Sequence, residues 1–168
     1  MKLTFSIATE TDAAEIAALR TAAAVRLTER FGHGRWSSTS TERAVLRELS
    51  RPKFERTLIA RDGRDIVAAL HLQTKKPWAI DISYFTPVER ALYLVGMAVL
   101  PERQESGAGR MLLKEGARVA KEWPARALRL DAWDADAGAG PFYEKCGFRE
   151  VGHVVYREAP LVYYELLL

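Results

Sequence analysis

Residues 91–109 read ALYLVGMAVLPERQESGAG and join a nearly continuous apolar run to a pair of glycines. The run Ala91–Val99 is typical of a strand that is covered on both faces. Gly107 and Gly109 follow where a helix is predicted to begin, although glycine costs about 0.5–1 kcal/mol in a helix interior relative to alanine. Two glycines at this junction indicate backbone that turns tightly or lies close to a ligand.

The segment after the glycines completes a succession of strand, helix and strand. From Gly107 to about Trp123, apolar residues recur on one helical face, and Pro124 ends the helix. The residues expected on that face are Ala108, Leu112, Val119 and Trp123. The alternating stretch ALRLDAW at 127–133 predicts another strand. This spacing favours two parallel strands joined by a right-handed crossover.

The N-terminal part of the chain predicts a short strand followed by a long helix. The strand is expected at residues 3–8, and the helix begins with Thr9 or Thr11 as its cap and runs to about Arg30. The apolar positions of this helix are Ile16, Leu19, Ala23, Val25 and Leu27.

A second helix, a hairpin and a long connection are predicted next. Thr39 followed by Glu42 resembles a capping box, which would open a helix that ends near Leu49. Residues 57–73 predict two strands around an Asp-Gly turn, a strong hairpin signal. Residues 75–90 contain aromatic residues and two prolines without a clear period, and we expect a long connection there.

The C-terminal part predicts a short helix that ends at Gly147 and a closing hairpin over the remaining residues. No internal repeat or linker interrupts the chain. The sequence therefore predicts one mixed α/β domain over residues 1–168.

Composition narrows the functional classes without choosing among them. The net charge is +3 and the basic residues are dispersed, which argues against a nucleic-acid-binding surface. The longest apolar run, residues 91–100, is too short to span a membrane, and the N-terminus becomes acidic too early for a signal peptide. Cys146 is the only cysteine, so no intrachain disulfide can form and a cytoplasmic protein is expected. His33, His71 and His153 do not have metal-ligand spacing.

The glycine pair does not match the common nucleotide-binding motifs. The dinucleotide fingerprint requires a third glycine where Leu112 stands, and the Gly-Lys-Ser/Thr of a phosphate loop is absent. Successive main-chain N–H groups at a turn before a helix nevertheless form a natural diphosphate cradle. The alternative is a tight turn with close packing of the helix on the sheet.

Two stretches resemble the signature motifs of one enzyme family. MAVLPERQESGAGRMLL at 97–113 resembles the acyl-CoA-binding motif of the GNAT superfamily of N-acetyltransferases. DADAGAGPFYEKCGF at 134–148 resembles the second signature of that family. The residues that match this second signature are Ala139, Phe142, Tyr143, Gly147 and Phe148. The predicted order of elements is similar to the family fold over nearly the whole chain.

The resemblance implies a mixed central sheet flanked by helices and direct transfer of an acetyl group from acetyl-CoA, without a metal. The end of the strand at Val99 would contact the pantetheine arm, and the N–H groups from Gln104 to Arg110 would hold the pyrophosphate. The cofactor-binding residues implied in this way are Met97, Ala98, Val99, Gln104, Glu105, Ser106, Gly107, Ala108, Gly109, Arg110 and Asp136. Tyr143 would be the catalytic residue that protonates the departing CoA thiolate.

The sequence departs from the family pattern at two places. Asp136 stands where the family usually has asparagine, so the side chain has no amide donor. The strand Ala91–Val99 has no carboxylate, although many relatives carry a glutamate there as the base. The remaining candidates for the base are Asp81, Glu89, Asp131, Asp134, His33 and His71. Asp131 and Asp134 are slightly favoured because they lie near the strand end that adjoins the expected site, but the sequence does not assign the base.

The expected acceptor is a primary amine on a small molecule, with a protein N-terminus or lysine as the second choice. Trp36, Trp78, Tyr84 and Phe85 are candidates for the walls of an acceptor pocket, and they are equally consistent with a homodimer interface or with core packing. The alternative from another class is a non-catalytic acyl-CoA-binding module on the same fold. No nucleic-acid or membrane partner is expected.

Overall fold

A computed structural model describes residues 2–168, which form two compact units. The first unit contains the residues up to Leu72 together with Gly96–Gly116, and the second contains Gln73–Val95 and Ala117–Leu168. Strand β4 (Ala91–Val99) and helix α3 (Ala108–Glu122) contribute residues to both units. The described residues contain seven strands and four α-helices, so the fold is mixed α+β as predicted.

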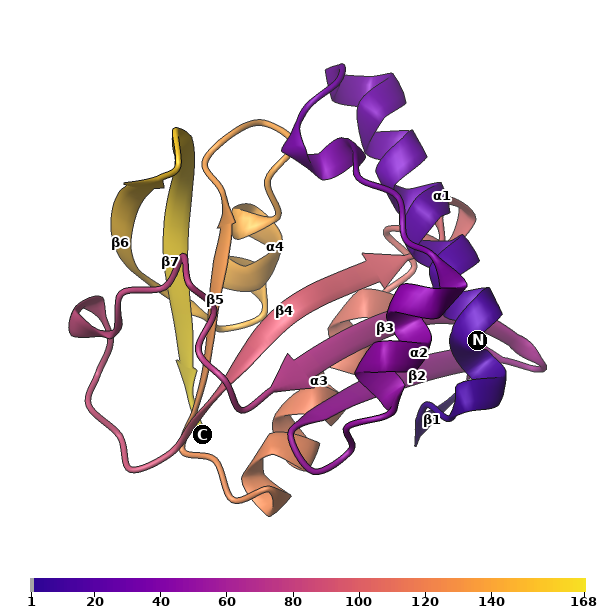
Figure 1. The fold of residues 1–168 in the computed structure, drawn as a ribbon, viewed down its shortest axis with the longest axis horizontal. Coiled ribbons are helices and arrows are strands. Elements are labelled where there is room, and N and C mark those ends of the chain that lie inside the picture. Colours follow the sequence, from indigo (N-terminus) through magenta and orange to yellow (C-terminus); the bar gives the residue numbers. More distant parts are fainter. Residues whose placement is uncertain (1) are drawn as a thin grey trace. The chain divides into compact units, whose positions relative to one another are not determined.

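The strands of the first unit follow the order β1-β2-β3-β4. The bounds are β1 Leu3–Ile7, β2 Glu55–Asp62 and β3 Asp65–Gln73. β1 pairs with β2 in antiparallel register, and Gly63 at the β2–β3 turn has a φ of 64°, as the Asp-Gly hairpin predicts. Helices α1 (Ala13–Phe31) and α2 (Glu42–Leu49) lie on one side of these strands, and the first turns of α3 lie on the other (Figure 1).

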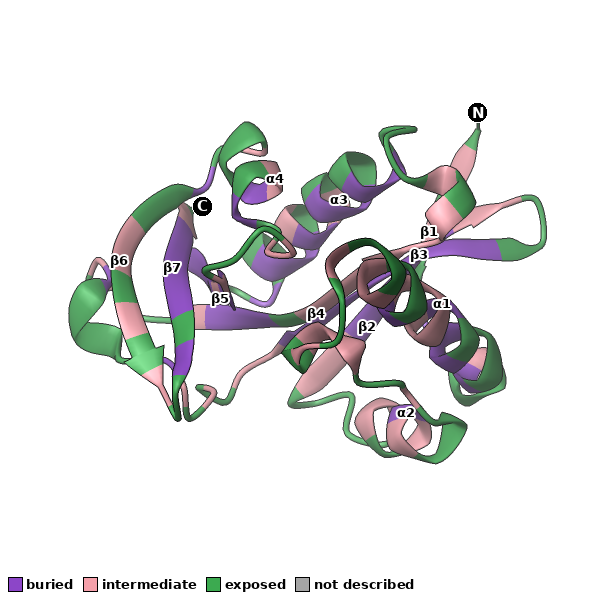
Figure 2. Ribbon diagram, turned by 90° about the horizontal axis from the view of Figure 1, so that it is seen from above, coloured by how far each residue is buried: buried purple, intermediate pink, exposed green. Residues whose placement is uncertain are grey.

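The core of this unit forms where α1 and α2 cover the strands. Ile16 and Leu19 of α1 pack with Val45 of α2 and with Ile59 of β2, and all four side chains are buried. Figure 2 shows α1 buried along one side and exposed along the other. Val25, expected among the inward residues, is 47% exposed. It follows Ile16 by nine positions, about two and a half helical turns, which places it on the opposite face.

The two helix starts compare differently with the sequence prediction. Thr9, one of the two predicted caps, is the N-cap of a 3-10 turn that leads into α1, and Asp12 is the N-cap of α1 itself. A short 3-10 turn, Glu10–Asp12, precedes α1, and the main-chain N–H of Thr9 donates to the Asp12 carboxylate at 2.8 Å. The predicted cap of the second helix, Thr39, was wrong. Thr41 is the cap, because its hydroxyl accepts a hydrogen bond from the N–H of Ala44 at 3.2 Å.

The second unit has the strand order β4-β5-β7-β6. The bounds of its further elements are β5 Ala127–Trp133, α4 Gly140–Lys145, β6 Arg149–Tyr156 and β7 Ala159–Leu167. β4 and β5 pair in parallel, as predicted, whereas β7 is antiparallel to both β5 and β6. The predicted inward face of α3 is also confirmed, since Ala108, Leu112 and Val119 are buried, as is Trp123 directly after the end of the helix.

The connection between β3 and β4 is fastened to one face of these strands. The buried guanidinium of Arg129 donates to the carbonyl of Thr86 at 2.8 Å, and the buried carboxylate of Glu165 accepts from the N–H of Thr86 at 3.1 Å. Phe85 packs on Tyr163 with ring centroids 5.2 Å apart. These contacts give a long segment without regular strands a defined path.

Candidate functional site

The loop between β4 and α3 turns through two residues in the left-handed region. After the 3-10 turn Pro101–Arg103, Glu105 has a φ of 64° and Gly107 a φ of 87°. A Cβ added to Gly107 would meet no atom within 4 Å, so the space beside its backbone is open. The glycine satisfies a backbone requirement and also leaves the main chain accessible to a ligand.

Several main-chain N–H groups of this loop donate no hydrogen bond within residues 2–168. The amides of Gln104 and Ser106 donate to main-chain carbonyls, each at 3.4 Å. Within residues 2–168, the N–H groups of Gly107, Gly109 and Arg110 have no hydrogen-bond acceptor. They lie at the N-terminus of the 15-residue helix α3, where the helix dipole also favours an anion. The N–H of Glu105 also has no acceptor among these residues, so the free donors of the predicted cradle lie on both sides of Ser106.

The predicted strand residues lie next to this loop in the first unit. Met97, Ala98 and Val99 are half-buried at the end of β4, and Ala98 packs on the core. The side-chain amide of Gln104 donates to the carbonyl of Val99 at 3.4 Å, which joins the strand end to the loop.

The edge of β4 is only partly paired. The parallel ladder to β5 covers Ala91–Tyr93 and ends at the pair Tyr93↔Arg129, although β4 continues to Val99. On this edge, Leu94 and Val95 therefore lack a ladder partner. A strand edge of this kind can receive an extended ligand through main-chain hydrogen bonds.

Tyr143 lies in the second unit, on α4, and is 6% exposed. Its ring packs edge-to-face on Phe142 and Phe148, and it lies 6.3 Å from the ring of Tyr164. Its hydroxyl has no hydrogen-bond partner among residues 2–168, and it is not among the fully enclosed polar atoms. Burial, with the nearby charge of Asp131 as a smaller cause, raises the pKa of this phenol, so the hydroxyl carries its proton at neutral pH.

Asp136 is exposed in the loop between β5 and α4, in the same unit as Tyr143. The structure places the predicted residues in two groups. The strand end and loop from Met97 to Arg110 belong to the first unit, and Asp136 and Tyr143 belong to the second.

The six candidates for the base have different surroundings. The carboxylate of Asp134 accepts a hydrogen bond from Nδ1 of His153 at 3.1 Å in an exposed pair. Glu89 and His33 are also exposed. Asp131, on β5, is half-buried, and burial raises the pKa of its carboxyl. A raised pKa suits a group that must accept a proton near neutral pH.

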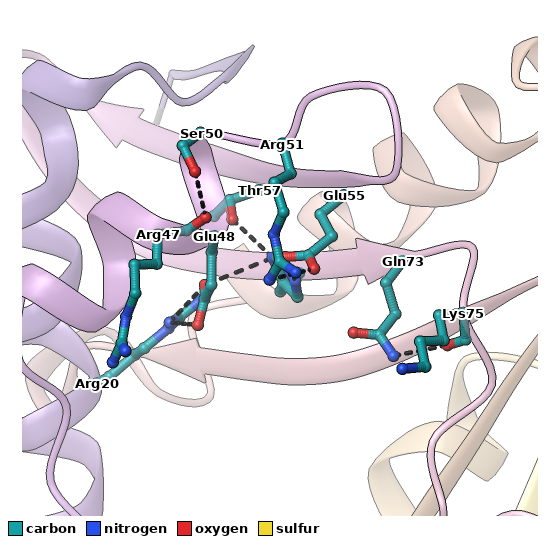
Figure 3. Close-up of polar contacts among 10 residues, drawn as sticks. Arg20, Arg47, Glu48, Ser50, Arg51, Glu55, Thr57, Gln73 and Lys75 are labelled. Carbon is teal, nitrogen blue, oxygen red and sulfur yellow. Dashed lines mark hydrogen bonds and ion pairs between the residues drawn. The ribbon is translucent and has the colours of Figure 1, made fainter.

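His71 is not free to contact a substrate, because both ring nitrogens are engaged. Nδ1 lies 2.8 Å from the Thr57 hydroxyl, and Nε2 lies 3.3 Å from a carboxylate oxygen of Glu55. The Glu48 carboxylate is 3.6 Å from Nδ1 and is itself held by both oxygens on Arg20, at 2.9 and 3.0 Å. Figure 3 shows Arg20 of α1, Glu48 of α2, and Glu55 and Thr57 of β2 gathered together. His71 comes from β3. Burial lowers the pKa of His71 despite the two carboxylates.

The sequence did not predict this cluster. Its members are separated by up to 51 positions, between Arg20 and His71, and each one alone is an ordinary residue of a helix or strand. Only the packing of α1 and α2 on β2 and β3 brings them together.

Comparison with known proteins identifies the family. Residues 15–148 match the family model described as the acetyltransferase (GNAT) family. Because this match covers most of the 168 residues, the chain belongs to the acetyltransferase (GNAT) family. A search of the curated proteins found no match.

Solved structures support the same fold. The PaiA N-acetyltransferase of Thermoplasma acidophilum, solved with coenzyme A, has a TM-score of 0.76 at 13% identity and covers 99% of this chain and 100% of its own. yncA of Salmonella typhimurium, solved with its cofactor acetyl-CoA, has a TM-score of 0.73 at 16% identity, with coverages of 99% and 94%. The ribosomal-protein-S18-alanine N-acetyltransferase of Escherichia coli has a TM-score of 0.71 at 17% identity, with the same two coverages.

Two further properties of the described residues concern membranes and metals. No helix within residues 2–168 is both long and apolar enough to cross a membrane. In the same part of the chain, no three His, Cys, Asp or Glu side chains are grouped so that they could hold a metal ion.

Proposed function

We propose that this chain is an N-acetyltransferase that transfers the acetyl group of acetyl-CoA directly to a primary amine of a small molecule. The observation that carries the proposal is the loop at the start of α3, where an open glycine and unpartnered N–H groups fit a diphosphate. Membership of the acetyltransferase family supports this reading of the loop.

The loop fits the diphosphate in both charge and space. The free N–H groups of Gly107, Gly109 and Arg110 donate toward an anion, and no Cβ blocks the approach at Gly107. The edge of β4 continues this site, because an extended pantetheine arm can pair with main-chain groups as an additional strand does. We assign the contacts with that arm to Met97, Ala98 and Val99 among others.

The chemistry requires a donor for the thioester oxygen and an acid for the leaving thiolate. As the amine nitrogen forms its bond to the carbonyl carbon, negative charge develops on the oxygen, and we assign the N–H of Val99 to stabilise it. The amine attacks in its neutral form, after its ammonium has released one proton to solvent. The C–S bond then breaks and the thiolate takes the proton of Tyr143, while the second proton of the amine nitrogen passes through water to the Tyr143 phenolate, so that an amide, a thiol and a protonated Tyr143 result. An unpartnered, protonated phenol is suited to this role.

The absence of a carboxylate on β4 favours one rival, a non-catalytic acyl-CoA-binding module. Two measurements separate the proposals. Thermal melting with and without acetyl-CoA, with NAD as the control ligand, tests the binding site. Detection of free thiol in the presence of a panel of small amines and of peptides with free N-termini tests the transfer.

The expected result is a higher melting temperature with acetyl-CoA alone and thiol release that depends on a small amine. A ligand at 100 times its Kd stabilises by about 2.7 kcal/mol, which shifts the melting temperature by several degrees. A shift without transfer to any amine or peptide would establish the binding module. No shift at millimolar acetyl-CoA, in folded protein free of CoA, would return the glycines to a packing role.

A further inference from the structure

A cleft of about 410 Å³ opens in the second unit between the β3–β4 connection and the β6–β7 hairpin. The residues that line its wall include Trp78, Asp81, Tyr84, Val155, Tyr156 and Tyr163. The volume is in the range of sites that hold a small organic ligand. Among the described residues that line the wall, Asp81 alone is charged, and four of the other eight are aromatic. This composition complements an organic cation.

The wall of the cleft is fixed before any ligand binds. The Tyr163 hydroxyl donates to the carbonyl of Ala79 and accepts from the N–H of Asp81 at 3.1 Å. Tyr84 packs on Tyr163 with an interplanar angle of 80° and centroids 5.4 Å apart. Tyr84 also lies directly against Gly152 of β6, where an added Cβ would be 2.3 Å from its ring. A ligand would therefore meet a preorganised surface.

The rim of the cleft leaves apolar side chains in water. Trp78 is 82% exposed and Val155 is 73% exposed. An apolar ligand that covers these side chains removes their surface from water, which is favourable. The ammonium of Lys75 lies 6.0 Å from the centroid of the Trp78 ring, so this ring already takes part in a cation–π contact.

The carboxylate of Asp81 retains capacity to bind a cation. Its Oδ1 accepts from the N–H of Ser83 at 3.0 Å and from the Ser83 hydroxyl at 2.7 Å. Oδ2 has no hydrogen bond, and Asp81 forms no ion pair, among residues 2–168. The two Ser83 hydrogen bonds lower the pKa of Asp81, with a smaller contribution from Lys76. The ammonium of Lys76 is itself occupied, because it donates to the carbonyls of Pro77 and Ile80.

The cleft and Tyr143 lie on opposite faces of the same strand of the second unit. Neighbouring side chains of β7 alternate, so Tyr163 lines the cleft and Tyr164 lies against Tyr143. Asp131 of β5 pairs with Tyr163 of β7 in the ladder, and its charge contributes to raising the pKa of both Tyr143 and Tyr163. The cleft and the proposed acid are therefore separated by the width of strand β7.

We propose that this cleft binds the acceptor, a primary ammonium that carries an aromatic or branched apolar body. Asp81 holds the charged nitrogen, and Trp78, with Tyr84 and Tyr156, holds the body. This assignment names the substrate class of the proposed function and rests on it, whereas binding to the cleft can be measured without acetyl-CoA.

The probe is 2-phenylethylamine at neutral pH, measured by calorimetry on the whole chain without acetyl-CoA. Its controls are 2-phenylethanol, which lacks the charge, and ethylamine, which lacks the ring. Asp81→Asn keeps the acceptor oxygen for Ser83 and removes the charge, and we expect its Kd for the probe to rise about fivefold. Asp65→Asn is the matched change of an exposed carboxylate in the first unit and leaves the Kd unchanged.

Two further variants test the aromatic wall. Trp78→Ala is expected to raise the Kd of 2-phenylethylamine about three- to tenfold. Gly152→Ala pushes on the Tyr84 ring from the β6 side without changing any charge, and it is expected to alter the same Kd. Equal binding of 2-phenylethanol, or an unchanged Kd in both Asp81→Asn and Trp78→Ala, would overturn the assignment, as would no binding of the probe.

Turnover separates the two proposals. If acetylation proceeds but the KM for the amine is the same in Asp81→Asn and Trp78→Ala, the transferase stands and the cleft is not its acceptor site. If the probe binds and responds to these variants but no amine is acetylated, the cleft is a cation site and the transferase is refuted.

Discussion

Replacing Gly107 by alanine tests the proposed phosphate loop, and Gly63 supplies a matched control. Both glycines are in the left-handed region, with φ of 87° and 64°, and an added Cβ at either would meet no atom within 4 Å. The substitution therefore costs backbone strain at both sites and causes no clash. That strain is about 1–2 kcal/mol, which corresponds to a melting temperature lower by roughly 2–8 °C.

The two variants are expected to differ in acetyl-CoA binding. At Gly107 the methyl group occupies the space through which a diphosphate approaches the N–H groups, and a hydrogen bond to a charged group contributes about 1.5–3 kcal/mol. The loss of one such bond raises the Kd about 10- to 100-fold. At Gly63 the turn joins β2 to β3 and the Kd stays the same.

Calorimetric titration with acetyl-CoA, at a temperature where both variants are folded, measures this difference. Thermal melting without ligand measures the strain in each variant. Equal affinities of Gly107→Ala and Gly63→Ala for acetyl-CoA would refute the assignment of the loop. A large loss of stability in Gly107→Ala alone would show that the backbone of this turn is more constrained than that of the Gly63 turn.

Three further predictions concern single side chains. Tyr143→Phe keeps the ring contacts and is expected to lower kcat by about 100-fold or more, with little change in melting temperature. Tyr164→Phe, which changes a neighbour in the same aromatic cluster, is expected to keep the kcat of the unmodified protein. Equal rates of the chemical step in the two variants, measured by stopped flow, would remove Tyr143 from the mechanism. The folded state lowers the pKa of His71 below its ordinary value of 6.5, so the unfolded chain binds the proton first and stability declines as pH falls below about 6.5. Urea unfolding across that range should show a weaker decline in His71→Gln, whereas His153, whose pKa is raised by hydrogen bonds to carboxylates, contributes the opposite slope. Gly138→Ala places a methyl group 1.9 Å from a main-chain carbonyl oxygen and should lower the melting temperature by several degrees; an unchanged value would show that the loop yields easily.

Local patterns predicted most of the elements because their causes lie within a few residues. The Asp-Gly turn produced the β2–β3 hairpin, and the apolar stripe from Ala108 to Trp123 produced the buried face of α3. The wrong prediction of the cap of α2 also has a local cause, because two nearby residues can serve as the cap. Thr39 and Thr41 are both acceptable caps, and the structure uses Thr41 because it directly precedes the first helical residue.

The candidate site was predictable only where one stretch of chain forms it. The glycine loop is contiguous, so the sequence showed both its turn and its exposed N–H groups. The surroundings of His71 and Asp131 were not predictable, because elements distant in the sequence bury these side chains and so shift their pKa values. The same burial makes His71 inaccessible to a substrate.

By itself, the sequence determined the family, the order of the elements, the glycine loop and the position of Tyr143 on a short helix. These properties follow from spacing along the chain, which the sequence contains in full. Tertiary structure alone decided that the Tyr143 hydroxyl has no hydrogen-bond partner within residues 2–168 and that both nitrogens of His71 are engaged. It also placed Asp81 among aromatic rings in a cleft, because residues 78–84 and 154–163 meet only when the connection is fastened to the sheet.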